Sequence, residues 1–162
     1  MHNLTKVLFG AAFLTTAAAE ARELPFAEAV LEHMRCDRAP TPTPFFIAID
    51  KAGRLDKDQS FGADSVSCYP IIGGVTIGGM EFDSICGFEE DKSVPGWSDF
   101  FYRGPGTSPG QRMSLQTRAP QSELQIWARE YVGGPKVDKL VRDRFEYQAP
   151  GSALECSSWI AH

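Results

Sequence analysis

Residues 65–91 read SVSCYPIIGGVTIGGMEFDSICGFEED, and this stretch decides the fold. It holds two of the four cysteines, inside apolar runs that two pairs of glycines interrupt. Side chains along a strand point alternately to its two faces, which places Cys86 on the apolar face of residues 80–88. We therefore expect two neighbouring strands here, at the centre of an antiparallel sheet.

The glycine pairs predict a hairpin turn between these strands. Tight hairpin turns need residues at positive φ, which glycine adopts without a steric penalty. Either Gly73 and Gly74 or Gly78 and Gly79 can form the turn, and an alternative role for the glycines is to let a ligand approach the backbone. Pro70 has no N–H group to donate within a sheet, so we expect it at an edge or at a bulge.

The N-terminal stretch has the pattern of a secretory signal peptide. A short polar start with one lysine precedes an apolar run over residues 7–19, which is too short to span a bilayer. Small residues allow cleavage after position 19 or 21, so we expect a signal over residues 1–19 or 1–21 and a single exported domain over residues 22–162. No cysteine directly follows either site, so no membrane anchor is expected; a buried N-terminal helix is the alternative interpretation.

Charge and length limit the function classes that fit this chain. Cleavage after position 19 takes one lysine from the 16 basic residues, which leaves 15 against 21 acidic residues and a formal net charge of −6. An acidic chain has no basic stripe for phosphates or anionic lipids, so neither nucleic acid nor a membrane surface is an expected partner. A chain of about 140 residues is long enough to bury one core.

The cysteines predict a disulfide framework. Export leads to the periplasm or to the outside of the cell, where conditions are oxidising and four cysteines suggest two disulfides. Of the three possible pairings we favour Cys68–Cys86, which would join neighbouring strands, with Cys36–Cys156, which would tie the first helix to the last strand. Metal binding is the alternative, but no C-x-x-C pair is present and we expect no metal.

Apolar periodicity assigns the remaining elements and the fold class. Residues 111–118 alternate as a half-exposed strand, with Met113, Leu115 and Thr117 inward. We expect an α+β fold, in which an antiparallel sheet of about five to seven strands has two or three helices packed on one face and is stapled by disulfides. The further expected segments are helices over residues 24–36, 120–132 and 136–144, an extended proline-rich connector over 39–44, and strands over 45–50, 145–148 and 153–160.

A G-x-S-x-G motif at residues 106–110 suggests an alternative, enzymatic function. In hydrolases this nucleophile elbow lies between a strand and a helix, with an aspartate and then a histidine downstream. Asp138 or Asp143 followed by His162 has that order. However, Pro109 has no N–H for an oxyanion hole, and a strand is expected next. A small envelope hydrolase that uses Ser108 or a carboxylate pair is therefore only the alternative.

Other catalytic groups are scarce. The chain has three histidines, of which one leaves with the signal and one is the last residue, so histidine-based catalysis and a zinc site are not expected. The acidic run at residues 89–91 offers a divalent-cation site as an alternative, although such runs are usually solvated. We expect no cofactor.

The aromatic run WSDFFY at residues 97–102, followed by Arg103 and a loop rich in glycine and proline, is the best candidate for a recognition surface. Rigid aromatic rings and arginine supply contact area at low entropic cost, although the same rings can equally belong to a core. We predict binding through Trp97, Phe101, Tyr102 and Arg103. The expected function is that of a non-catalytic binding, inhibitor or envelope accessory protein, with another envelope protein or a cell-wall polymer as partner; the ligand and the oligomeric state stay open.

Overall fold

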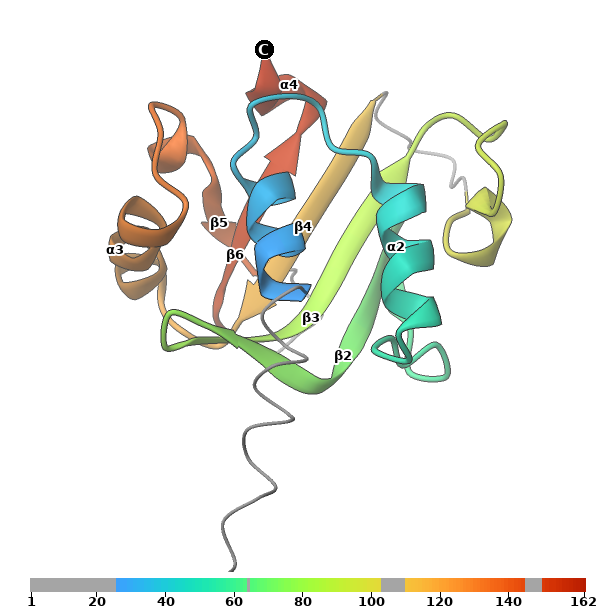
Figure 1. Cartoon of the computed structure of the whole chain (residues 1–162), viewed down its shortest axis with the longest axis horizontal. Coiled ribbons are helices and arrows are strands. Elements are labelled where there is room, and N and C mark those ends of the chain that lie inside the picture. The colour runs from blue at the N-terminus through green and yellow to red at the C-terminus, as the bar shows by residue number, and fades with distance from the viewer. Residues whose placement is uncertain (1–25, 64, 103–109, 145–149) are drawn as a thin grey trace, which may run out of the picture.

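The computed structural model describes residues 26–63, 65–102, 110–144 and 150–162. In this part of the chain, strands form one antiparallel, curled sheet in the order β1-β2-β3-β4-β6-β5 (Figure 1). The strands are β1 (Phe61–Ala63), β2 (Val66–Ile77), β3 (Met80–Glu89), β4 (Gln111–Thr117), β5 (Val141–Asp143) and β6 (Ser152–Ser157).

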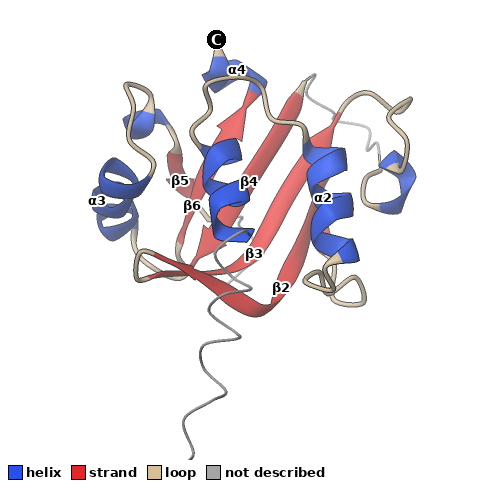
Figure 2. Ribbon diagram, viewed as in Figure 1, coloured by secondary structure: helices blue, strands red, loops and turns tan. Residues whose placement is uncertain are grey.

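The helices pack against one face of this sheet, as Figure 2 shows. They are an N-terminal helix (residues 26–34), α2 (Pro42–Lys51), α3 (Gln121–Tyr131) and the short α4 (Ser158–Ala161), with 3₁₀ turns η1 (Trp97–Asp99) and η2 (Val137–Lys139). The α+β class, the antiparallel sheet and the placement of the helices are therefore confirmed.

The two glycine pairs have different roles in the β2–β3 hairpin. Gly78 and Gly79 form the turn, with φ of 53° and 80°. Gly73 and Gly74, with φ of 77° and 64°, lie where the β2–β3 register shifts. Pro70 lies just before this irregularity, beyond the last β2 residue that pairs with β1, so the prediction of an edge or a bulge is confirmed.

Packing against α3 shapes the tip of this hairpin. Trp127 of α3 donates its Nε1–H to the Ile77 carbonyl at 2.7 Å, and its ring centroid lies 5.1 Å from that of Phe82. Tyr131 stacks on Trp127 and covers the turn so closely that a Cβ atom on Gly78 would lie 2.2 Å from its ring. Only glycine fits both the backbone conformation and the space at this position.

The core lies between the helices and the sheet. Phe46 of α2 and Met34 of the N-terminal helix are fully buried in one cluster with Ile85 of β3 and Leu115 of β4. Gly87 of β3 allows the close approach of α2, because a Cβ atom there would lie 2.9 Å from the Phe46 ring. Burial of side chains of this size contributes roughly 1.5–3 kcal/mol each.

Both disulfides have the favoured pairing. Cys68 and Cys86 are directly opposite each other on β2 and β3, with Cα atoms 4.0 Å apart. Cys36 follows the N-terminal helix and joins Cys156 of β6 across 120 residues of sequence. In the chain-entropy model, closing these loops stabilises the fold by about 3 and about 5 kcal/mol, respectively.

The expected strand over residues 45–50 is wrong, because this segment is helical as part of α2. Pro42 and Pro44 lie in the first turn of α2, where backbone N–H groups have no intrahelical partner and proline is tolerated. Phe45, Phe46 and Ile49 then fall on one helical face and are buried. The proline-rich connector is correspondingly shorter than expected.

The expectation of a half-exposed β4 is also wrong. Met113 is buried on the helix side, but Ser114 and Gln116 on the opposite side are buried as well. These polar side chains satisfy one another, with Gln116 Nε2 donating to Ser114 Oγ at 2.8 Å, and Arg112 pairs with Glu155 of β6. Alternation of polar and apolar residues therefore does not mark an exposed face here.

The predictions for the C-terminal segments are confirmed only in part. Residues 136–144 do not form the expected helix but the turn η2 followed by β5. The last predicted strand ends at Ser157, and α4 follows it. The helices expected over residues 24–36 and 120–132 are confirmed where described, while the strand expected over 145–148 lies outside the described residues.

Candidate functional site

A hollow of about 340 Å³ lies between β1, the start of β2 and the segment made of η1 and the residues after it. We call it the Tyr102 hollow. It brings together two parts of the chain that lie about 40 positions apart and includes part of the predicted aromatic run. Its lining consists of Ser60, Phe61, Gly62, Ser67, Tyr69, Ser98, Asp99, Phe100, Phe101 and Tyr102.

Buried neighbours hold the aromatic wall of this hollow in place. Tyr69 donates its hydroxyl to the Phe100 carbonyl at 2.6 Å, and the Phe101 N–H donates to the Trp97 carbonyl at 2.9 Å. The rings of Phe100 and Phe101 pack edge-on against Phe46, with centroids 5.9 and 5.2 Å away. The backbone that presents Tyr102 is therefore anchored to both the sheet and α2.

The predicted binding residues occupy different environments. Phe101 is only 4% exposed and serves as an anchor in the core, whereas Tyr102 is 48% exposed at the hollow. Trp97 is half-buried outside the hollow, where its Nε1–H donates to the Glu89 carbonyl at 2.7 Å. Arg103 lies outside the described residues. The structure thus brings Phe101 and Tyr102 to one site.

The chemistry of the hollow combines rings with hydroxyl groups. Ser60 and Ser98 are exposed hydroxyls, and Asp99 supplies a carboxylate. Burial raises the pKa of Tyr69, although a hydrogen bond from Ser67 opposes the shift and the charge of Asp50 adds to it. Tyr69 therefore stays a neutral hydroxyl at physiological pH and keeps its hydrogen bond to the wall.

Sequence reasoning missed the β1 side of this hollow. Ser60 and Phe61 line the same hollow as Tyr102. β1 pairs with β2, and the segment from η1 to Tyr102 packs beside these two strands. No motif or spacing in the sequence links these positions. The aromatic run at residues 97–102 was the one usable signal in the sequence, because rigid aromatic rings supply contact area at low entropic cost.

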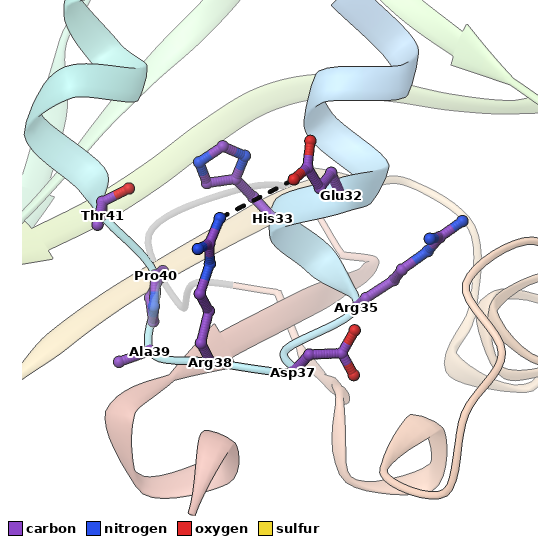
Figure 3. A pocket seen from close by; sticks show the side chains of 8 residues that line it. All are labelled: Glu32, His33, Arg35, Asp37, Arg38, Ala39, Pro40 and Thr41. Carbon is purple, nitrogen blue, oxygen red and sulfur yellow. Dashed lines mark ion pairs between the residues drawn. The ribbon is translucent and has the colours of Figure 1, made fainter.

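A second hollow, of about 450 Å³, lies at the connector between the N-terminal helix and α2 (Figure 3). Arg38 reaches across it to Glu32, with Nη2 and Oε1 3.9 Å apart, while Arg35 and Asp37 point away from this pair. The His33 ring lies 4.6 Å from the Phe45 ring, and its Nδ1 lies 2.9 Å from the Ala29 carbonyl oxygen.

This connector hollow offers weaker grounds for ligand binding than the Tyr102 hollow. The Arg38 and Glu32 side chains are highly exposed, and ion pairs between exposed side chains contribute little. The remaining charges of its lining, on Arg35 and Asp37, also balance each other. The connector hollow therefore selects no ligand charge and exposes no aromatic ring as prominently as Tyr102.

The aspartates considered for catalysis have other hydrogen-bond partners in the described part of the chain. Ser108 and most of its motif lie outside the described residues. Asp138 accepts hydrogen bonds from Gln125 and Arg129 of α3, and Asp143 accepts one from Gln121. Both aspartates thus form hydrogen bonds with side chains of α3.

The acidic run after β3 has a structural role. Glu90 accepts a hydrogen bond from the Gly110 N–H at 2.6 Å, and Asp91 accepts bonds from the hydroxyl and the N–H of Ser93. Glu89 is only 4% exposed, and this burial raises the pKa of its carboxyl group. Among the described residues, no group of three or more potential ligands is arranged to hold a metal ion.

Comparison of the chain with protein-family models, with curated proteins and with solved structures finds no match. Within the described ranges, no helix has the length and apolar character needed to cross a membrane. The two disulfides fit a protein that folds outside the reducing cytoplasm.

Proposed function

We propose that this chain is a small exported protein of the periplasm or the extracellular space that binds a partner in the cell envelope without transforming it. The Tyr102 hollow is the binding site in this proposal. The signal-peptide pattern and the two disulfides support export.

One observation carries the proposal: an exposed aromatic ring stands on a backbone that buried neighbours hold in place. Tyr102 is 48% exposed, while the two preceding residues, Phe100 and Phe101, are buried in the core. A ring with few rotatable bonds on an anchored segment loses little conformational freedom when a partner covers it. Such rings often dominate the energy of binding sites.

The proposal predicts that Tyr102→Ala weakens retention of the protein on envelope material. We expect the variant to fold with both disulfides and to lose about tenfold or more of its affinity for washed envelopes, measured by co-sedimentation. Trp159→Ala is the matched control, because Trp159 is 70% exposed and does not line the Tyr102 hollow. Unchanged retention of the Tyr102 variant would contradict the proposal.

The alternative, a small envelope hydrolase, depends on Ser108 or on a carboxylate pair. A fluorophosphonate probe tests the serine version directly, because such probes react with activated serine nucleophiles. We expect no labelling of the folded protein. Stoichiometric labelling of Ser108 would replace the binding proposal with the enzymatic one.

A further inference from the structure

The lining of the Tyr102 hollow has the mixed chemistry that a sugar ring requires. A saccharide presents C–H groups on the faces of its ring and hydroxyl groups around its rim. In the hollow, Phe61 and Tyr102 offer ring surface, while Ser60, Ser98 and Asp99 offer exposed oxygen atoms. Hydroxyl groups both donate and accept hydrogen bonds, and a carboxylate accepts up to about four.

The charge of the lining selects against anionic ligands. The described residues that line the hollow include no lysine or arginine, and Asp99 is the one carboxylic acid among them. Lys57, which is not part of the lining, has its Nζ atom 4.8 Å from the centroid of the Phe100 ring and pairs with Asp50 at 3.1 Å. Among the described residues of the lining, a phosphate or a uronic acid would therefore meet a carboxylate and no cation.

The size of the hollow favours a small ligand, such as one sugar unit, over the surface of a partner protein. Its volume of about 340 Å³ is near the lower end of the range for small-molecule sites. The other exposed large apolar side chains of the described residues, Ile72, Ile126, Tyr131 and Trp159, do not line it. The described residues around the hollow thus do not form the continuous apolar core that a stable protein–protein interface has.

From these observations we infer that the Tyr102 hollow binds a neutral sugar unit of an envelope polysaccharide. This inference rests on the proposed binding function and names the ligand class for the same site. The Tyr102 ring stacks on the face of the sugar, and the Asp99 carboxylate accepts hydrogen bonds from two of its hydroxyl groups.

Isothermal titration of the exported chain with chitotetraose and with cellotetraose, two neutral oligosaccharides, tests the inference. We expect saturable binding of at least one of them, and about tenfold weaker binding for Tyr102→Ala and for Asp99→Asn. Arg38→Ala in the connector hollow and Trp159→Ala are controls and should leave the affinity unchanged. Melting temperatures and thiol counts verify that each variant folds with both disulfides.

An anionic tetrasaccharide of hyaluronate tests the role of charge. We expect it to bind the unmodified chain at least about tenfold more weakly than the better neutral probe. Asp99→Asn should narrow this difference, because the substitution removes the repulsive carboxylate and keeps an acceptor oxygen. Equal or tighter binding of hyaluronate to the unmodified chain would overturn the assignment to neutral sugars.

The outcomes separate this inference from the proposed function. If neither neutral oligosaccharide binds, or if Tyr102→Ala binds them normally, the saccharide assignment is wrong. When Tyr102→Ala nevertheless loses retention on envelopes, the binding function stands and its ligand is not a neutral saccharide. When retention is also unchanged, both the inference and the proposed function are wrong.

Discussion

At the scale of single residues, Glu89 carries the clearest electrostatic consequence of the fold. Its carboxyl group is buried at the end of β3, and desolvation raises its pKa more than hydrogen bonds from Asp91, Gln111 and Glu90 lower it. The folded state therefore binds the proton of the Glu89 carboxyl group more tightly than the unfolded chain does. Its contribution to stability is fully present below the ordinary pKa near 4.5 and is lost as the pH rises through the raised value.

The pKa of Asp91 is shifted in the opposite direction to that of Glu89. Hydrogen bonds from the hydroxyl and then from the N–H of Ser93 lower its pKa, so its contribution is present above the ordinary pKa and is lost as the pH falls through the lowered value. The Asp91 carboxylate is fully exposed, and we expect Glu89 to dominate the pH dependence that arises from this run.

We predict that Glu89→Gln raises the melting temperature at pH 7 by about 3 °C, since it removes a buried charge and keeps an acceptor oxygen for the Asp91 N–H. The gain should shrink as the pH falls toward 4.5, where Glu89 itself becomes neutral. Thermal denaturation at several pH values measures this. Glu123→Gln, an exposed position on α3, is the control; a gain that is independent of pH would contradict the assignment.

At the scale of secondary-structure elements, the β2–β3 turn depends on its contact with α3. Alanine at position 78 must accept a φ of 53° and also displace the ring of Tyr131, which lies 2.2 Å from the Cβ position. At Gly53, by contrast, φ is 68° and no atom lies within 4 Å of the Cβ position. The two glycines therefore separate backbone strain from steric clash.

We predict that Gly78→Ala destabilises the fold by about 2–4 kcal/mol and Gly53→Ala by only about 1 kcal/mol. Urea denaturation gives both free energies of unfolding. Adding Tyr131→Ala to the Gly78 variant should relieve the clash, so that the two substitutions are not additive. If the two glycine variants are equally stable, the packing of Tyr131 on the turn is wrong.

Some secondary-structure elements of this fold can be predicted from the sequence, and others cannot. The central hairpin was predictable because paired glycines and alternating side chains leave few other conformations. The α2 helix was not, because the apolar run of residues 45–49 has no period long enough to separate a helix from a strand. In β4, Ser114 and Gln116 suggested an exposed face, yet they are buried and Gln116 donates to Ser114.

The candidate site was predictable only from its aromatic side. The sequence pointed to residues 97–102 but could not assign each ring to the core or the surface. That division depends on α2. The Phe46 ring packs against the rings of Phe100 and Phe101, whereas Tyr102 is exposed. Since α2 was itself expected as a strand, the geometry of this wall was beyond sequence reasoning.

At the scale of the whole molecule, the two disulfides constrain very different lengths of chain. We predict that replacing both Cys36 and Cys156 with serine destabilises the fold by about 5 kcal/mol, against about 3 kcal/mol for Cys68 and Cys86. The reason is the larger unfolded-state entropy that the longer loop releases. Guanidinium denaturation of the two double variants measures the difference, and the reverse order would contradict this account.

The Cys36–Cys156 bond also has a consequence for the fate of the molecule after proteolysis. It joins positions 120 residues apart, so nearly the whole of the folded chain forms a covalent ring. One peptide bond hydrolysed anywhere inside that ring opens it without releasing a fragment. A clipped copy should therefore migrate near full length on a non-reducing gel and separate into two bands only after a thiol reductant is added.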